Sequence, residues 1–103
     1  MKFETYLLDA LMRDLVGHSR SPAAFLVYLQ LYRHSIAAGR ESVSMSHAMM
    51  ADSTGLSKRA VQSGVALLSE RQLVSVARAH STAVPVYTVL TPWRRIASPR
   101  GAE

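Results

Sequence analysis

Five polar side chains that can bind nucleic acid stand close together in the middle of the chain: Ser57, Lys58, Arg59, Gln62 and Ser63. Arginine can make paired hydrogen bonds to guanine, and glutamine to adenine. Arg59, Gln62 and Ser63 would share one face of an α-helix, because residues three and four apart are neighbours on a helix. Ser57 and Lys58 would lie at its positively polarised start, which suits phosphate oxygens. The spacing predicts a helix that reads bases through Arg59 and Gln62, with Ser63 as a secondary contact.

Four more basic side chains nearer the C-terminus are candidates for the same surface: Arg78, His80, Arg94 and Arg95. Arg78 and His80 stand between two strand-like runs, near the expected tip of a hairpin, where they could hold a phosphate or enter a minor groove. Arg94 and Arg95 could touch phosphates or only flank Trp93, which we expect to pack on the core or on a partner. For all of these candidates the alternative is an ordinary solvated side chain.

No set of residues points to catalysis or to a bound metal. The chain has no cysteine, which excludes disulfides, thiol catalysis and cysteine-ligated metal sites. The histidines lack metal-ligand spacing and fall in separate predicted elements: His18, His34, His47 and His80. No set of nucleophile, base and orienting group can be assembled around the serines, and a glycine-rich phosphate loop is missing. We expect a protein that is not an enzyme and has no cofactor or metal.

The net charge of +5 comes from the second half of the chain. Residues 1–56 hold five basic and five acidic side chains, whereas residues 57–100 hold seven basic side chains and one acidic side chain, Glu70. The sequence pI is about 10.2, which favours a polyanionic partner. The basic excess therefore lies in the same half as the candidate binding residues.

The length of 103 residues indicates a single domain. No apolar run approaches the roughly 20 residues that span a membrane. Glu4 and Asp9 interrupt the N-terminal segment, which lacks the form of a signal peptide. We therefore expect a soluble, cytoplasmic protein without a membrane partner.

Two helices are predicted before residue 40. Residues 3–16 carry apolar side chains at the spacing of one helix face, and Gly17 is expected to end this helix. Ser21 and Pro22 suit the cap and the first position of a second helix, which is expected to end at Gly39. The second helix is apolar on two sides. We therefore expect the N-terminal helix, from the same chain or from a second copy, to cover one of them.

A helix, a tight turn and a second helix follow in the middle of the chain. Ser46 is the expected cap of a brief helix that reaches about residue 53. Gly55 can adopt the positive φ of a tight turn, and Ser57 can cap a helix over residues 57–72. The inward side of that helix is predicted to hold Val61, Gly64, Val65 and Leu68. This order of capping residues, turn glycine and helices is typical of a helix-turn-helix.

Short strands are predicted around these helices. Residues 73–79 and 84–90 are rich in β-branched side chains and predict an antiparallel pair. Pro85 should lie at a strand start or an edge, because proline has no N–H for a central ladder. Val43 can add one or two pairs as a minor strand.

Together these segments resemble the winged helix-turn-helix DNA-binding domains of bacterial, plasmid and phage regulators. The resemblance is carried by residues 46–62, which include the run Thr54-Gly55-Leu56-Ser57, by leucines at 67, 68 and 73, and by the hairpin through 86–89. It covers about residues 21–91. It implies that the helix over 57–72 enters the major groove while the hairpin forms a wing. With the N-terminal helix before this domain, the overall arrangement is similar to that of dimeric regulators of the MarR type.

The sequence thus predicts an α+β fold, a winged helix-turn-helix with a three-helix core, a two-stranded wing and an additional N-terminal helix. Residues 1–20 are expected to serve packing or dimerisation, 21–91 to form the DNA-binding domain and 92–103 to form a basic tail. The predicted function is sequence-specific binding of double-stranded DNA by a homodimeric transcriptional regulator. Two alternatives remain: a plasmid or phage replication or partition factor that binds repeated sites, and a winged helix that docks a protein partner without DNA.

Overall fold

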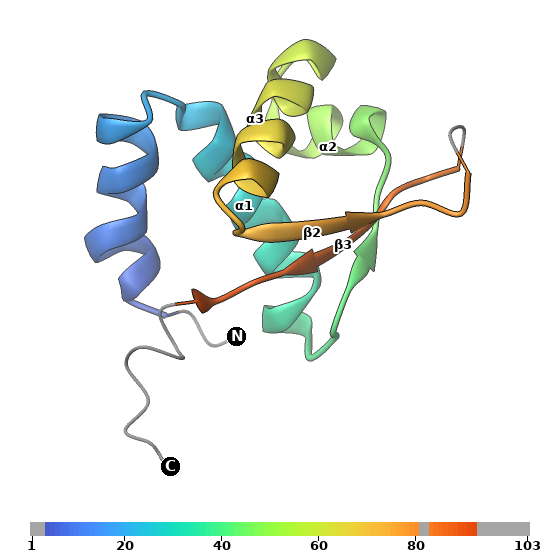
Figure 1. Cartoon of the computed structure of the whole chain (residues 1–103), viewed down its shortest axis with the longest axis horizontal. Helices are drawn as coiled ribbons and strands as arrows, with labels where there is room; N and C mark the ends of the chain where they lie inside the picture. The colour runs from blue at the N-terminus through green and yellow to red at the C-terminus, as the bar shows by residue number, and fades with distance from the viewer. Residues whose placement is uncertain (1–3, 81–82, 93–103) are drawn as a thin grey trace.

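A computed structural model describes residues 4–80 and 83–92 of the chain (Figure 1). In these residues an N-terminal helix and helices α1 to α3 pack with a three-stranded antiparallel sheet. The predicted α+β class is confirmed, and the order of the elements is compatible with a winged helix. None of the described helices is long and apolar enough to cross a membrane. The predicted tail over 92–103 lies outside the described residues apart from Pro92.

The N-terminal helix consists of η1 (Leu7–Leu11) and η2 (Arg13–His18), wound with the wide π-helical hydrogen-bond pattern. At the end of η2, for example, the Ser19 N–H donates to the carbonyl of Asp14, five residues earlier, at 2.9 Å. Leucines spaced four apart turn inward and are buried: Leu7, Leu11 and Leu15. The apolar spacing therefore predicted the helix and its buried face correctly over the described residues, which begin at position 4.

The N-terminal helix ends at His18, one residue past the predicted end, but the expected role of Gly17 as its terminating glycine is wrong. Gly17 lies inside η2 and its φ is not positive, so it does not act as a left-handed helix terminator. The chain instead turns at Arg20, whose φ is 53°. A positive φ costs a non-glycine residue about 1 kcal/mol or more, so the joint carries backbone strain.

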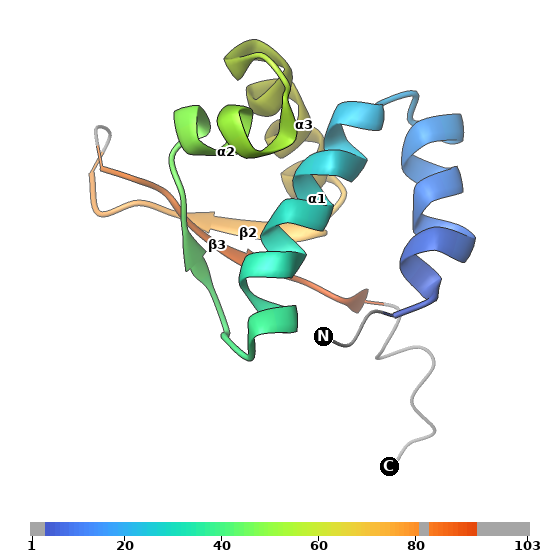
Figure 2. The same cartoon turned by 180° about the vertical axis from the view of Figure 1, so that it is seen from behind.

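Helix α1 (Pro22–His34) is the central helix of the domain. Ser21 caps it as predicted, because its Oγ accepts the N–H of Ala24 at 3.1 Å. Figure 2 shows α1 between the N-terminal helix and the remaining elements, which explains why both of its sides are apolar. Its buried side chains are Ala24, Phe25, Val27, Tyr28, Leu31 and Tyr32. A short turn, η3 (Ile36–Ala38), then leads to Gly39, whose φ of 76° ends the segment.

Helices α2 (His47–Thr54) and α3 (Lys58–Glu70) are joined by a tight turn. Ser46 caps α2 as predicted, and its Oγ accepts the Met49 N–H at 3.1 Å. Gly55 adopts a φ of 81° at the turn, which glycine does without steric cost. Leu56 packs against the core between the two helices. The predicted helix, turn and helix are therefore present with the expected boundaries to within two residues.

The sheet has the order β1-β3-β2, and both of its pairings are antiparallel. Strands β2 (Val74–Ala77) and β3 (Val86–Val89) form the predicted hairpin, and β1 (Val43–Ser44) is the predicted minor strand. Tyr87 in β3 lies opposite Val43 on one side and Val76 on the other. Pro85 directly precedes β3, as its missing N–H requires.

The core forms where α1, α3 and the sheet meet. Helix α3 contributes the four inward residues that the helical wheel predicts: Val61, Gly64, Val65 and Leu68. Gly64 lies against α1, because a Cβ built at this position would stand 3.2 Å from both the Cα and the backbone N of Ala24. The absence of a side chain at Gly64 thus permits the close approach of α1 and α3.

Two buried tyrosines differ in how their hydroxyl groups are satisfied. The Tyr28 hydroxyl donates to the Leu90 carbonyl at 2.8 Å and ties α1 to the end of the hairpin. Among the described residues, the Tyr87 hydroxyl is buried without a hydrogen-bond partner. Burial also raises the pKa of Tyr87, while Arg78 acts in the opposite direction. A buried polar group that makes no hydrogen bond lowers stability.

Tyr87→Phe is expected to raise the free energy of unfolding by about 1–2 kcal/mol, because it removes a desolvated hydroxyl and keeps the ring. Tyr28→Phe is the matched control and should lower it by about 0.5–1.5 kcal/mol, since it deletes a hydrogen bond that is made. Urea unfolding followed by circular dichroism measures both changes. Equal losses of stability in the two variants would contradict this account of Tyr87.

Candidate nucleic-acid interface

The outer face of α3 carries the five side chains that the sequence singled out. All five are exposed to solvent: Ser57, Lys58, Arg59, Gln62 and Ser63. The polar face and the buried face of α3 are separate, because its buried residues lie on the opposite side: Val61, Gly64, Val65 and Leu68. Toward the C-terminal end the exposed face continues with the small side chains of Ala66 and Ser69. The face is slender enough for an α-helix to lie in a DNA major groove about 12 Å wide.

The start of α3 is fixed by hydrogen bonds, of which the Ser57 cap was predicted from the sequence. The Ser57 Oγ accepts the N–H of Ala60 at 3.1 Å. In the preceding turn the Thr54 hydroxyl donates to the Met50 carbonyl at 2.7 Å and accepts the Leu56 N–H at 3.2 Å. Because its oxygen already caps the helix, Ser57 can offer a phosphate only its hydroxyl hydrogen. Its main role in the structure is to orient the start of α3.

One side of this face meets residues from α2 and from the hairpin. The Gln62 Nε2 lies 3.5 Å from the Nδ1 of His47, the first residue of α2. Arg78 directly follows β2 and stands close enough to His47 to affect its protonation, as does Lys58. Three elements therefore bring Lys58, Gln62 and Arg78, all predicted site residues, together around His47. This group of four is called the basic corner below.

The basic corner disfavours an additional positive charge. The pKa of His47 lies below its ordinary value, first because the ring is partly buried and then because Arg78 and Lys58 repel the charged form. The neutral form of His47 is therefore favoured beside the two cations of the basic corner, Lys58 and Arg78. Cations held close together attract a polyanion.

Sequence reasoning missed His47 as a member of the interface. Fifteen residues separate it from Gln62, and only the crossing of α2 and α3 brings the two side chains into contact. One signal was available, because His47 follows the cap Ser46 and so opens a helix whose start favours anions. The start of α2 becomes a candidate contact only because the fold brings α3 and the hairpin close to it.

Two basic residues fall on or near the hairpin connection. Arg78 and His80 are both exposed and directly follow β2. Arg78 belongs to the basic corner, whereas His80 lies two residues farther toward the hairpin tip, on the N-terminal side of residues 81–82, which lie outside the described part. The predicted contacts at Arg94 and Arg95 also lie outside the described residues.

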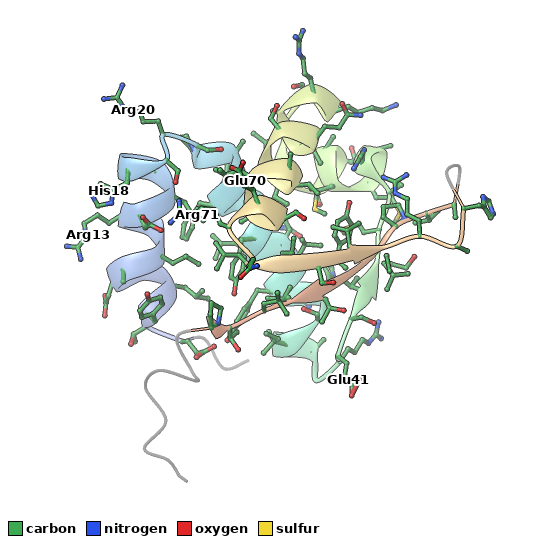
Figure 3. All side chains as sticks on the ribbon, in the orientation of Figure 1. Arg13, His18, Arg20, Glu41, Glu70 and Arg71 are labelled. Carbon is green, nitrogen blue, oxygen red and sulfur yellow. The ribbon has the colours of Figure 1, made fainter. Side chains whose placement is uncertain are left out.

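Arg71, one of the seven basic residues in 57–100, forms its contacts with the N-terminal helix segment rather than on the candidate face. Its guanidinium group donates to the Asp14 carboxylate and to the Ser19 hydroxyl, so it ties the end of α3 to the N-terminal helix. Figure 3 shows Arg71 between these two elements, and it shows Arg13 and Arg20 on the N-terminal helix side of the domain. The charge asymmetry of the sequence thus overstates the cations on the candidate face, where the described residues supply Lys58, Arg59 and Arg78.

The chemistry of the site is that of hydrogen-bond donation and positive charge. Lys58 and Arg59 are donors only, and Gln62 offers a donor and an acceptor on one amide. In residues 4–80 and 83–92, no group of three or more histidines and carboxylates is placed to hold a metal ion.

Comparison of the chain with known family models, with curated protein sequences and with solved structures finds no match in any of the three.

Proposed function

We propose that the chain is a winged helix-turn-helix protein that binds double-stranded DNA in a sequence-specific manner and acts as a small transcriptional regulator. The observation that carries the proposal is the outer face of α3, where Lys58, Arg59 and Gln62 are exposed together. In the proposed complex α3 lies in the major groove. Arg59 and Gln62 read base edges there, and Ser63 adds a smaller contact.

The position of charge along α3 supports this orientation. Lys58 and Arg59 lie in the first turn, and the acidic Glu70 is its last residue. With a rise of 1.5 Å per residue, about 18 Å separate the two ends of α3. Phosphates would therefore meet the basic end, where the helix dipole also favours negative charge, while Glu70 would remain distant from them.

The hairpin supplies a second contact in this proposal. Arg78 and Lys58 both act electrostatically on His47 within the basic corner, so a DNA backbone that follows the edge of the groove would meet the two cations together. Such contacts position the protein without reading sequence. His80, farther along the connection, would be the next residue to approach the backbone.

The test is binding to a fluorescently labelled mixed-sequence duplex, followed by anisotropy as the salt concentration rises. Three or four phosphate contacts should give a slope of log affinity against log salt of about −3 to −4. Specific binding adds a preference for one duplex over others at constant salt. No binding to any duplex at low salt would contradict the proposal and would favour the alternative of a protein-docking domain.

We further propose that the regulator is a homodimer formed through its N-terminal helix. Three apolar side chains form an exposed stripe beside the buried leucines of that helix: Leu8 is 49% exposed, Met12 39% and Val16 38%. An apolar stripe of this kind is typical of a surface that is covered by a partner. Two copies related by a two-fold axis would present two α3 helices to half-sites about one DNA turn apart.

Met12→Lys should convert the dimer into a monomer, because it places a charge at the centre of the stripe. The matched control is Met49→Lys, which introduces the same charge on α2 at a methionine that is 54% exposed. Sedimentation velocity at micromolar concentrations measures the outcome. A wild-type chain that is already monomeric in this range would contradict the dimer.

A further inference from the structure

His47 lies where three parts of the proposed DNA surface meet. It opens α2, its Nδ1 is 3.5 Å from the Gln62 side chain of α3, and Arg78, directly after β2, acts on it electrostatically. It is neither a core residue nor a fully exposed one. Unlike the lysine and arginines of the surface, its charge can change between about pH 5 and pH 8.

We propose that His47 is a protonatable phosphate contact, so that the protein takes up a proton at His47 when it binds DNA. This inference rests on the proposed function and adds a pH dependence to it. It assigns a role to a side chain that has no part in base reading.

In the free protein the surroundings favour the neutral form of His47. Partial burial is the main reason that its pKa lies below the ordinary value, and repulsion by Arg78 and by Lys58 adds to it. Those two groups are the charged side chains that act on it from the hairpin and from α3. Neither is a carboxylate that could hold the imidazolium form.

A phosphate placed at the basic corner acts against the two electrostatic causes of the lowered pKa and adds a hydrogen-bond acceptor. Its negative charge compensates Arg78 and Lys58, and its oxygens can accept a hydrogen bond from the imidazolium ring. The pKa of His47 must then be higher in the complex than in the free protein. By linkage the affinity increases as the pH falls through the bound-state pKa, and it levels off below the free-state pKa, which lies under the ordinary value of 6.5.

The same proton affects Gln62. An unprotonated Nδ1 can accept the Gln62 amide N–H, whereas the imidazolium is a donor at both ring nitrogens. Protonation of His47 therefore removes Nδ1 as the acceptor for the Gln62 amide N–H, whose hydrogens can then pair with a base. Proton uptake and base reading by Gln62 are expected to occur together.

The experiment measures duplex affinity from about pH 5.5 to about pH 8. The probe is a labelled duplex of about 20 base pairs, two helical turns. In the wild type the dissociation constant should fall by up to about tenfold per pH unit between the free and bound pKa values. His47→Gln keeps a polar side chain and should remove most of that dependence. His18→Gln, on the N-terminal helix, should retain it, and His80→Gln separates the contribution of the other histidine near the surface.

A second measurement uses the wild type alone and does not depend on the folding of a variant. The ring resonances of His47 are titrated by NMR without and with the duplex, and the expected result is an upward shift of its titration midpoint. Binding with the same pH dependence in wild type and His47→Gln, or an unmoved midpoint, overturns this inference and leaves the proposed function standing. Failure to bind any duplex at any pH overturns both.

Discussion

Gly64→Ala is expected to lower the free energy of unfolding by about 1–3 kcal/mol, although alanine is the better helix former. On helix propensity alone, the substitution would stabilise α3 by up to about 1 kcal/mol. Against this, the new Cβ would stand 3.2 Å from the backbone N and Cα of Ala24 and 3.3 Å from the carbonyl carbon of Ala23. Backbone atoms within a helix cannot rotate away as a side chain can. The helices must separate, and the steric effect exceeds the propensity gain.

Gly17→Ala is the matched control for this prediction. Gly17 is also within a helix, but a Cβ at this position meets nothing within 4 Å. Here the reduced freedom of the unfolded chain should raise stability by about 0.5–1 kcal/mol. Urea unfolding of both variants gives the comparison. Similar stabilisation by the two substitutions would show that α1 and α3 do not pack as closely as the structure places them.

Arg59→Ala and Lys58→Ala are expected to weaken DNA binding in two different ways. Loss of a bidentate contact from Arg59 to guanine should cost about 1–3 kcal/mol on the preferred site and relax the preference at one position. Loss of Lys58 should weaken binding to all sequences alike and reduce the salt slope by about 1. The reason for the difference is placement, since Lys58 is the first residue of α3 and belongs to the basic corner, whereas Arg59 faces outward.

Arg20→Asn controls for the general loss of a positive charge. Arg20 is exposed and lies on the side of the N-terminal helix, as Figure 3 shows, and asparagine tolerates the positive φ of this position. The affinity of the Arg20→Asn variant for DNA should remain close to that of the wild type. Anisotropy titrations on the preferred duplex and on single-base variants separate the three cases. Uniform losses from both Arg59→Ala and Lys58→Ala would remove Arg59 from the base-reading role.

Local sequence signals predicted the helices well, because helix caps and apolar spacing depend on residues that are close together in the sequence. Ser21, Ser46 and Ser57 were each predicted as caps, and each side chain accepts a backbone N–H at the start of its helix. The periodicity of α3 likewise predicted its buried and exposed faces. The π-helical winding of the N-terminal helix was not predictable in the same way, since leucines spaced by four residues are compatible with either winding.

Features that depend on distant segments were predicted incompletely. The minor strand at Val43 was expected, but its pairing with Tyr87 rather than with β2 follows from the three-dimensional path of the chain. Counting charges placed Arg71 in the same basic half of the chain as the candidate residues, although its side chain binds Asp14 across the domain. His47 enters the interface only through the crossing of α2 and α3. The candidate face was therefore predictable from one helix, while its surroundings required the fold.

Selection of bound duplexes from a random-sequence pool tests the central claim most directly, because it examines DNA binding, sequence preference and symmetry together. We predict enrichment of one motif with guanine and adenine at the positions that Arg59 and Gln62 read. The motif should be repeated with two-fold symmetry at a centre-to-centre spacing of about 10–10.5 base pairs. Recovered duplexes with the same base composition at every position as the starting pool would contradict sequence-specific DNA binding by this chain.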